Sequence, residues 1–384
     1  MISKLKRFKY EQIISLIRKE QRISRVAIAK QTGYSKPTVS KIINHLIEKD
    51  FVKEIGMGKG NSNGGRKPII VSFNENYNNV ISVDIGGTKT IIALLNLDGK
   101  ILKSETFSSE VFQNKDTLVE ILSEKINDFV LHAGKNTLLG ISIGVPGVVD
   151  KKKGIVSYIP SFNISNLNLE SVLNEKFDLP VYLENDVTLS AYGEIWIGNG
   201  KQYNTILLVS IGTGIGGGIV IDNKVHTGMG GSAGEICDMV TDWTKERDKK
   251  SGFGRLEEWI GGHALEKFIV EKEIGKDLRS FTDKDIKNEK FDNFLFEGAT
   301  HLGLAIANAI LLLDPDKVIL AGGVGYNFYE KMYPTINKTL KHVLPHSFYR
   351  NDLIEKSLLE PYGCVIGGCN AVQKENLINS IFKM

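Results

Sequence analysis

Two glycine-rich turns, each set between β-rich runs, most constrain how this 384-residue chain can fold. The first is Gly86-Gly87 in VISVDIGGTKTIIALLNLDG, and the second is Gly212-Thr213-Gly214 in TILLVSIGTGIGGGIVIDN. Each is followed by a second strand and then by an Asp-Gly or Asp-Asn turn, which predicts an antiparallel meander. The turns begin at residues 86 and 212, so they are separated by about one domain length. The body is therefore interpreted as a duplication of a meander followed by helices.

The surroundings of the two turns suggest how they are used. The second turn satisfies GxGxxG, but a β-run over 218–221 follows it where a dinucleotide-binding fold requires a helix, so that fold is excluded. Two glycine turns facing each other across a cleft would present backbone N–H groups to both sides of a phosphate chain. Asp84, on the strand entering the first turn, is placed to orient a hydrated Mg²⁺ near Thr88 and Lys89. The alternative is that each turn is only structural.

Further elements follow each turn. The pattern predicts a helix over about 116–133, a strand over about 138–143, a turn at Pro146-Gly147, and a strand ending at Glu184. A helix opened by Asn185-Asp186 comes next, and the second unit begins at 204.

The first 68 residues differ in charge from the rest. They carry 16 Lys and Arg against 5 Asp and Glu, a net of +11, whereas the remainder carries −8 and the whole chain +3. A basic segment attracts polyanions, and phosphate neutralisation supplies most non-specific affinity for DNA. The alternative is a merely solvated basic surface.

The basic segment also has the pattern of a helix-turn-helix. Apolar spacing predicts a helix over 8–19. Ser24 is expected to cap a second helix that stops at Gly33, and Ser35 a third with Pro37 in its first turn. Strands over 51–55 and 69–73, joined by GMGKGNSNGG and Arg66-Lys67-Pro68, read as a wing. The predicted DNA-contacting residues are Ser35, Lys36, Thr38, Ser40, Lys41, Asn44, Arg66 and Lys67. The alternative is a small helical bundle with a glycine linker.

Composition excludes several classes of protein. With 42% apolar and 24% charged residues the chain is an ordinary globular protein. The longest nearly apolar run, 302–313, is shorter than the ~18 residues of a membrane span, and the N-terminus lacks the apolar core of a secretion signal. The cysteines, Cys237, Cys364 and Cys369, form no CxxC pair and no disulfide framework. We expect a cytoplasmic protein without a membrane partner.

Residues 80–384, with the winged segment in front, resemble the ROK family (repressors, open reading frames, kinases). The matching motifs, in chain order, are DIGGTKT (84–90), VPGVVD (145–150), ENDVTLSAYGE (184–194), SIGTGIGGG (210–218), GGSAGEI (230–236), GRLEE (254–258) and DPDKVILAGGV (314–324). A winged head followed by GGRKP is typical of the repressor branch, the xylose repressors in particular. The resemblance implies an α/β protein with an actin-like, hexokinase-type (RNase H-like) two-lobed ATPase fold. The implied domains are a head over 1–75, lobe I over 76–190 completed by a C-terminal helix over about 366–384, and lobe II over 191–365.

The resemblance also implies a site between the lobes. Asp186 matches the base of the family's kinases, and Asn185 the residue that holds the sugar. The implied sugar-binding set is Asn185, Asp186, Glu235, Asp238, Glu257 and Gly147. The implied ATP- or phosphate-binding set is Asp84, Gly86, Gly87, Thr88, Lys89, Gly212, Thr213, Gly214, Gly322 and Gly323. The alternative for Asp186 is that it only caps a helix beginning at Val187.

Departures from the family pattern concern its zinc and its sugar. The family's ExGH is Glu235-Ile236-Cys237-Asp238 here, so Asp238 replaces the histidine, and Asp248, Lys250 and Arg255 stand where three cysteines would be. Because a zinc site needs about four N or S ligands, no zinc is expected and no protein metal site is assigned. We hypothesise instead that Asp238 and Asp248 pair with Lys250 and Arg255. Ser161 replaces an asparagine near the sugar, and the seven histidines show no metal-ligand spacing.

Two functions are compatible with these features. The first is a sugar-responsive transcriptional repressor, a homodimer or higher homo-oligomer whose head binds operator DNA and whose body closes on a small sugar. The second is an ATP-dependent sugar kinase of the hexokinase or glucokinase type, using Mg-ATP, that retains a DNA-binding head. The intact glycine turns and Asp186 allow the second, whereas Asp238 argues for the first.

Overall fold

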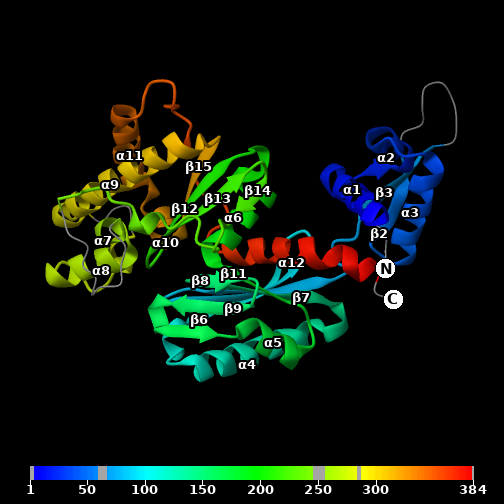
Figure 1. The fold of residues 1–384 in the computed structure, drawn as a ribbon, viewed down its shortest axis with the longest axis horizontal. Coiled ribbons are helices and arrows are strands. Elements are labelled where there is room, and N and C mark those ends of the chain that lie inside the picture. The colour runs from blue at the N-terminus through cyan, green and yellow to red at the C-terminus, as the bar shows by residue number, and fades with distance from the viewer. Residues whose placement is uncertain (1–3, 59–66, 245–255, 283–286, 383–384) are drawn as a thin grey trace.

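The computed structural model describes residues 4–58, 67–244, 256–282 and 287–382. A head formed by the N-terminal residues lies beside a body of two lobes, and the C-terminal helix runs between the lobes toward the head (Figure 1).

The head is a winged helix-turn-helix. Its helices are α1 (Lys4–Glu20), α2 (Arg25–Thr32) and α3 (Lys36–Glu48). Its sheet has the order β1-β3-β2, with β1 at Ile23–Ser24, β2 at Val52–Met57 and β3 at Ile69–Phe73.

The predicted caps of the head are confirmed. Ser24 Oγ accepts from the N–H of Ala27 at 3.1 Å, Gly33 ends α2 at φ 72°, and Ser35 Oγ accepts from the N–H of Thr38 at 3.3 Å. Each cap depends only on residues a few positions apart: the two serines bond to a nearby backbone N–H, and Gly33 adopts a left-handed conformation. The sequence can therefore predict all three. Helix α1 starts earlier than expected, and β1 was not expected.

Lobe I is built on a five-stranded sheet of order β11-β7-β4-β5-β6. Its strands are β4 (Asn79–Ile85), β5 (Lys89–Asn96), β6 (Ile101–Ser108), β7 (Leu138–Val145) and β11 (Val181–Asn185). Helices α4 (Lys115–Ala133) and α5 (Leu169–Phe177) belong to the same lobe, as does a small sheet of β8 (Val148–Asp150), β9 (Ile155–Ile159) and β10 (Ile164–Leu167).

Lobe II repeats this plan with the sheet order β14-β13-β12-β15-β16. Its strands are β12 (Ile206–Ile211), β13 (Ile215–Ile221), β14 (Lys224–His226), β15 (Lys317–Ala321) and β16 (Ile354–Lys356). Its helices are α7 (Glu257–Ile260), α8 (Gly262–Glu271), α9 (Glu289–Leu313), α10 (Gly322–Asn327) and α11 (Tyr329–Val343). In both lobes an antiparallel meander is extended by two parallel strands, so the predicted duplication is confirmed.

Two helices connect the lobes. Helix α6 (Asp186–Trp196) follows the last strand of lobe I but contacts β12 and β13 of lobe II, and α12 (Gly363–Phe382) follows lobe II but contacts β4, β5 and β7 of lobe I. The helices also pack on each other (Figure 1). A Cβ at Gly193 of α6 would lie 2.7 Å from the carbonyl oxygen of Gly363, so the backbones approach as closely as glycine allows.

The hydrophobic core of the head is continuous with that of lobe I. One buried cluster includes Ile13 and Leu46 from the head, Ala93 from β5, and Val372 and Ile381 from α12. Helix α9 is long and apolar enough, by length and composition alone, to cross a membrane. Many of its apolar residues, including Leu295, Leu302 and Ile306, instead lie in the core of lobe II.

Candidate functional site

Helix α3 presents a polar face to solvent. Val39, Ile42, Ile43 and Leu46 are buried, so the residues between them point outward. Of the predicted DNA-contacting residues, Ser35, Lys36, Lys41, Asn44 and Lys67 are exposed, and Thr38 and Ser40 are half-buried. Arg66 lies outside the described residues.

Arg25 of α2 holds one residue of this face in place. Its Nη1 donates to Asn44 Oδ1 at 2.6 Å, while its Nη2 pairs with Glu54 Oε1 of β2 at 2.9 Å. The guanidinium therefore ties the predicted DNA-reading helix to the sheet of the wing. The role of Arg25 is not predictable from the local sequence, because its two partners are far from it in the chain.

Three elements converge where the two lobes meet, at the place of the predicted inter-lobe cleft. Asp84 is on β4, opposite Gly144 of β7; Asp186 is the first residue of α6; and Cys364 is in the first turn of α12. A Cβ on Gly144 would lie 3.4 Å from the Cα of Asp186 and would collide with the sulfur of Cys364. Glycine at this position therefore lets the three meet.

The two cleft carboxyls have raised pKa values. Desolvation raises the pKa of Asp84 to about 6, although a hydrogen bond from Cys364 and the charge of Lys89 oppose the shift. Desolvation, together with the charge of Asp84 and of Glu235, raises the pKa of Asp186 to about 8. Burial beside these carboxylates also raises the pKa of the Cys364 thiol, which therefore stays protonated and donates. Both shifts favour the protonated form, and that of Asp186 is the larger.

Glu360 adds a third carboxyl that the sequence analysis missed. Its Oε1 accepts from the N–H of Gly322 at 2.5 Å, and burial raises its pKa. Gly322 is one of the predicted phosphate contacts, and its N–H donates to Glu360. The arrangement thus places an acidic side chain beside one of the predicted phosphate contacts.

The two glycine turns face each other. A Cβ on Gly87 would lie 3.2 Å from Thr213 Oγ1 of the opposite turn and 3.1 Å from Ser161 Oγ. Glu257 braces the second turn, since its Oε1 accepts from the N–H of Ile215 at 3.1 Å. The side chain of Glu257, the first residue of α7, therefore lies against the second glycine turn.

Asn185, and not Asp186, caps α6. Asn185 Oδ1 accepts from the N–H of Thr188 at 2.9 Å, and its Nδ2 donates to Gly147 O at 3.3 Å and to Asp186 Oδ1 at 3.1 Å. The alternative that Asp186 is the cap of a helix beginning at Val187 is wrong, because α6 begins at Asp186 and its N-cap is Asn185. The Asp186 carboxyl is desolvated by burial and lies near Asp84 and Glu235, whose charges also raise its pKa.

Comparison with known proteins decides the family. The model of the ROK family matches residues 80–375, and that of a winged helix-turn-helix DNA-binding domain matches residues 11–53. The chain belongs to the ROK family. It is 31% identical over 369 residues to the xylose repressor of Caldicellulosiruptor bescii, covering 90% of each chain.

Solved structures agree with this fold. This ROK protein matches a ROK family transcriptional regulator, a homologue of the E. coli MLC protein, with a TM-score of 0.81, 23% identity and 98% coverage of both chains. It also matches a ROK family glucokinase from Streptomyces griseus in complex with glucose and AMPPNP, with a TM-score of 0.65, 22% identity, and 77% and 99% coverage. The predicted family and fold are confirmed, and the chain is a ROK-family transcriptional regulator with a DNA-binding head.

The structure groups the predicted residues unevenly. Asp84, Asn185 and Asp186 meet in the cleft, as described above. Glu235 and Asp238 lie at the 3-10 turn Ile236–Asp238, both exposed, where Cys237 Sγ lies 3.5 Å from Glu235 Oε2. Lys250 and Arg255, which are hypothesised to pair with Asp238 and Asp248, lie outside the described residues, as does Asp248. The site assignments therefore stay predictions.

Proposed function

We propose that this ROK protein is a sugar-responsive transcriptional repressor of carbohydrate-utilisation genes. The observation that carries the proposal is the course of α12. At its first turn Cys364 donates to Asp84 in the cleft. At its last turn Phe382 stacks on His45 of α3, with ring centroids 5.9 Å apart, and meets the edge of Tyr10 at 4.8 Å. A single helix therefore contacts both the candidate sugar site and the candidate DNA-reading helix.

Further contacts join the head to the body near α12. Arg7 Nη1 donates to Asn379 Oδ1 at 3.1 Å. Arg18 donates to the carbonyl oxygen of Leu97, and its guanidinium lies 5.6 Å from the ring of Trp196 on α6. Because α6 also begins in the cleft, both inter-lobe helices reach the head. We propose that a sugar bound at Asn185 and Asp186 shifts these helices and changes the affinity of the head for DNA.

Such a response needs a difference in affinity. The sugar must bind more tightly to one arrangement of lobes and head than to the other, and operator DNA must prefer the opposite arrangement. The similarity to a xylose repressor makes xylose the first sugar to test. We propose that the effector releases the operator, that the protein binds a palindromic operator as a homodimer, and that it acts in the cytoplasm.

The kinase alternative has less support. A sugar kinase needs its triphosphate in the clamp and an ionised base on the sugar hydroxyl. Glu360 accepts from the N–H of Gly322, so an acidic side chain lies beside a residue that the clamp would need for the triphosphate. We infer that the cleft senses sugar without phosphorylating it.

The test is a titration that reads both activities. Duplexes from the region upstream of the protein's own gene are bound by anisotropy and titrated with xylose, glucose and other common sugars, with and without Mg-ATP. ADP is assayed in the same samples. We expect sequence-specific binding that one sugar reverses with no ADP formed. Sugar-dependent ADP formation, with only weak and salt-sensitive DNA binding, would instead identify a kinase.

A further inference from the structure

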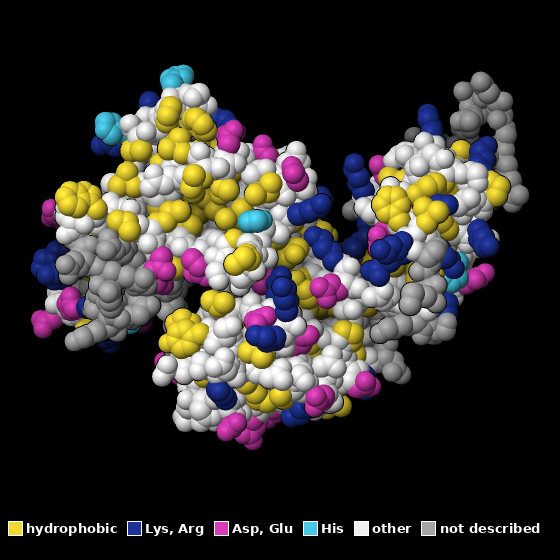
Figure 2. All heavy atoms as spheres, in the orientation of Figure 1, with side chains coloured by type: hydrophobic (Ala, Val, Ile, Leu, Met, Phe, Trp, Pro, Cys, Tyr) yellow, Lys and Arg dark blue, Asp and Glu magenta, His cyan; other side chains and the backbone are white. Residues whose placement is uncertain are grey.

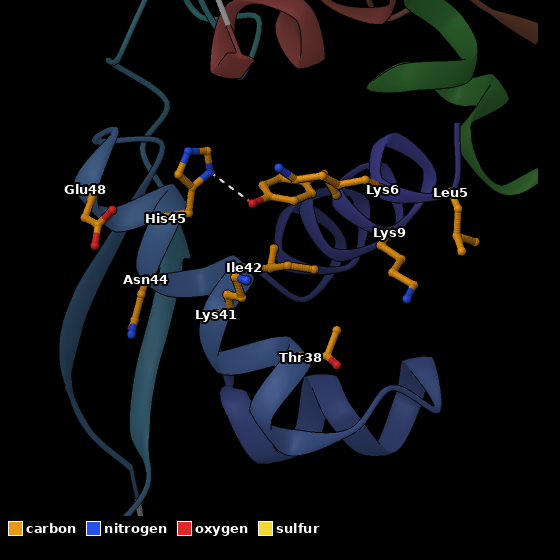
Figure 3. Close-up of a pocket in the computed structure, with 10 residues that line it drawn as sticks. Leu5, Lys6, Lys9, Thr38, Lys41, Ile42, Asn44, His45 and Glu48 are labelled. Carbon is orange, nitrogen blue, oxygen red and sulfur yellow. Dashed lines mark hydrogen bonds between the residues drawn. The ribbon is translucent and has the colours of Figure 1, made fainter. Parts of the chain in front are cut away.

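A groove of about 910 Å³ lies in the head between α1 and α3. Thr38, Lys41 and Asn44 line it from α3 (Figure 3). These three belong to the face that the sequence predicts to contact DNA. The groove is therefore part of the candidate DNA-binding surface and continues it onto a second helix.

The wall from α1 is basic. Lys6 and Lys9, which are three residues apart and so neighbours on one face of the helix, both line the groove. Lys6 Nζ lies 5.1 Å from the ring centroid of Phe382, and Lys9 Nζ lies 5.5 Å from that of Tyr34. These aromatic contacts favour particular positions for two long side chains that would otherwise move freely.

The charges of the groove match a polyphosphate. Three lysines, Lys6, Lys9 and Lys41, line it against one acidic residue, Glu48, at the C-terminal end of α3. Ile42 and Tyr10 also line the groove, and the Tyr10 hydroxyl lies 3.0 Å from His45 Nδ1. This contact joins the α1 and α3 sides of the groove.

We propose that Lys6 and Lys9 bind the DNA phosphates that border the major groove entered by α3. The inference rests on the proposed function. A helix fills a major groove about 12 Å wide, and a second helix packed 8–10 Å from its axis lies over the flanking backbone. Contacts of this kind fix the position of the reading helix and carry no sequence information themselves. Sequence-dependent contacts are left to α3, and Lys6 and Lys9 set its depth and angle.

The experiment compares salt dependence of DNA binding in the full-length protein. The probes are a 30-bp duplex selected by the wild-type protein from a random library and a 30-bp duplex of arbitrary sequence. The variant is Lys6→Gln with Lys9→Gln, since glutamine keeps the helix propensity of lysine without its charge. Two lost phosphate contacts should reduce the slope of log K against log salt by about 1.8. Affinity for both duplexes should fall by a similar factor, so their ratio should stay unchanged.

A matched control comes from lobe II. Lys338 and Lys341 are exposed and, like Lys6 and Lys9, lie three residues apart on one helix; α11 lies far from the head (Figure 1). Lys338→Gln with Lys341→Gln should leave the slope unchanged. The charge-conserving variant Lys6→Arg with Lys9→Arg should keep the wild-type salt slope. Each single glutamine variant should show about half of the slope reduction of the double variant, which keeps the test decisive if the double variant unfolds.

The outcomes separate the two proposals. If the wild type binds its selected duplex and the Lys6/Lys9 glutamine variant keeps the wild-type slope, this groove does not bind DNA and the proposed function stands. Loss of affinity for the selected duplex alone would make the lysines sequence readers and would overturn the proposal of a purely positioning role. If the wild type selects no duplex, both proposals fail. Tighter capture of an acidic peptide than of DNA would assign the groove to a protein partner.

Discussion

Asp186 is the residue whose environment and role conflict most. A carboxyl that accepts from a sugar hydroxyl or acts as a base should be ionised, yet desolvation and the neighbouring Asp84 raise its pKa to about 8. The cause is structural, because α6 begins at this residue and points it into the convergence of β4, β7 and α12. Ionisation of the Asp186 carboxyl in the folded protein therefore lowers the free energy of unfolding.

Asp186→Asn should stabilise the protein, and the gain should depend on pH. The folded pKa of about 8 lies above the ordinary value of 3.8, so the folded state keeps a proton that the unfolded state has lost over this range. Stability from this group is full below about pH 4 and falls as pH rises to about 8. Thermal unfolding from pH 5 to pH 9 should show the variant gaining roughly 2–4 °C at pH 9 and less at pH 5. Asp222→Asn, in an exposed turn, is the control, and a gain that does not vary with pH would contradict the assignment.

Glu360→Gln should admit a nucleotide. Glutamine can still accept from the N–H of Gly322, so the local geometry is kept while one negative charge leaves the phosphate clamp. Calorimetric titration with Mg-ATP should show binding at least about tenfold tighter than that of the wild type. Glu330→Gln on the exposed side of α11 should change nothing. Tight Mg-ATP binding by the wild type would show that Glu360 does not block the clamp.

At the scale of elements, the sequence predicts those that depend on neighbouring residues and misses those that depend on residues far away in the chain. Caps at Ser24, Gly33 and Ser35 are predictable because each bond joins residues within a few positions. Strand β1 is missed because two residues become a strand only by pairing with β3, at Ile23 opposite Val71. The meanders are predictable from alternating apolar residues and from the turns between them. The small sheet of β8, β9 and β10 instead depends on packing into the core of lobe I.

The same reasoning applies to the candidate site. Asp84, Asn185 and Asp186 can be found because they lie in motifs. Glu360 and Cys364 reach the cleft only because α12 returns from lobe II to pack on lobe I, which no local pattern indicates. Arg25 is missed for the same reason, since its partners come from α3 and β2.

Ser24→Ala should loosen the first turn of α2. The hydroxyl satisfies the N–H of Ala27, and losing such a cap costs about 1 kcal/mol. Hydrogen exchange at Ala27 should accelerate about fivefold. Ser24→Thr should restore protection, because threonine caps similarly, and Ser15→Ala on the exposed face of α1 should have no effect. Unchanged exchange at Ala27 would mean that pairing of β1 with β3, not the cap, fixes this turn.

At the scale of the molecule, the basic head is built onto an acidic body without a free linker between them. The shared core and the Arg18 contacts mean that lobe I and the head move as packed neighbours. In Figure 2 lysines and arginines lie on the face of the head, and acidic and basic side chains are mixed over the body. A bound polyanion is thus directed to the head, and a change in the cleft reaches it through α6 and α12.

Phe382→Ala should weaken the coupling between sugar and DNA. The ring is the contact of α12 with His45 and Tyr10, and its removal leaves the cleft end of the helix intact. DNA affinity is measured by anisotropy with and without a saturating amount of the sugar that releases the wild type, and the ratio of the two affinities is the coupling factor. That factor should fall at least about fivefold, while sugar affinity without DNA changes by less than about twofold. Phe296→Ala, a partly exposed phenylalanine on α9, should leave the factor unchanged. A wild-type factor in the Phe382 variant would show that the signal bypasses the end of α12, leaving the Arg18 contact with α6 as the route to test next.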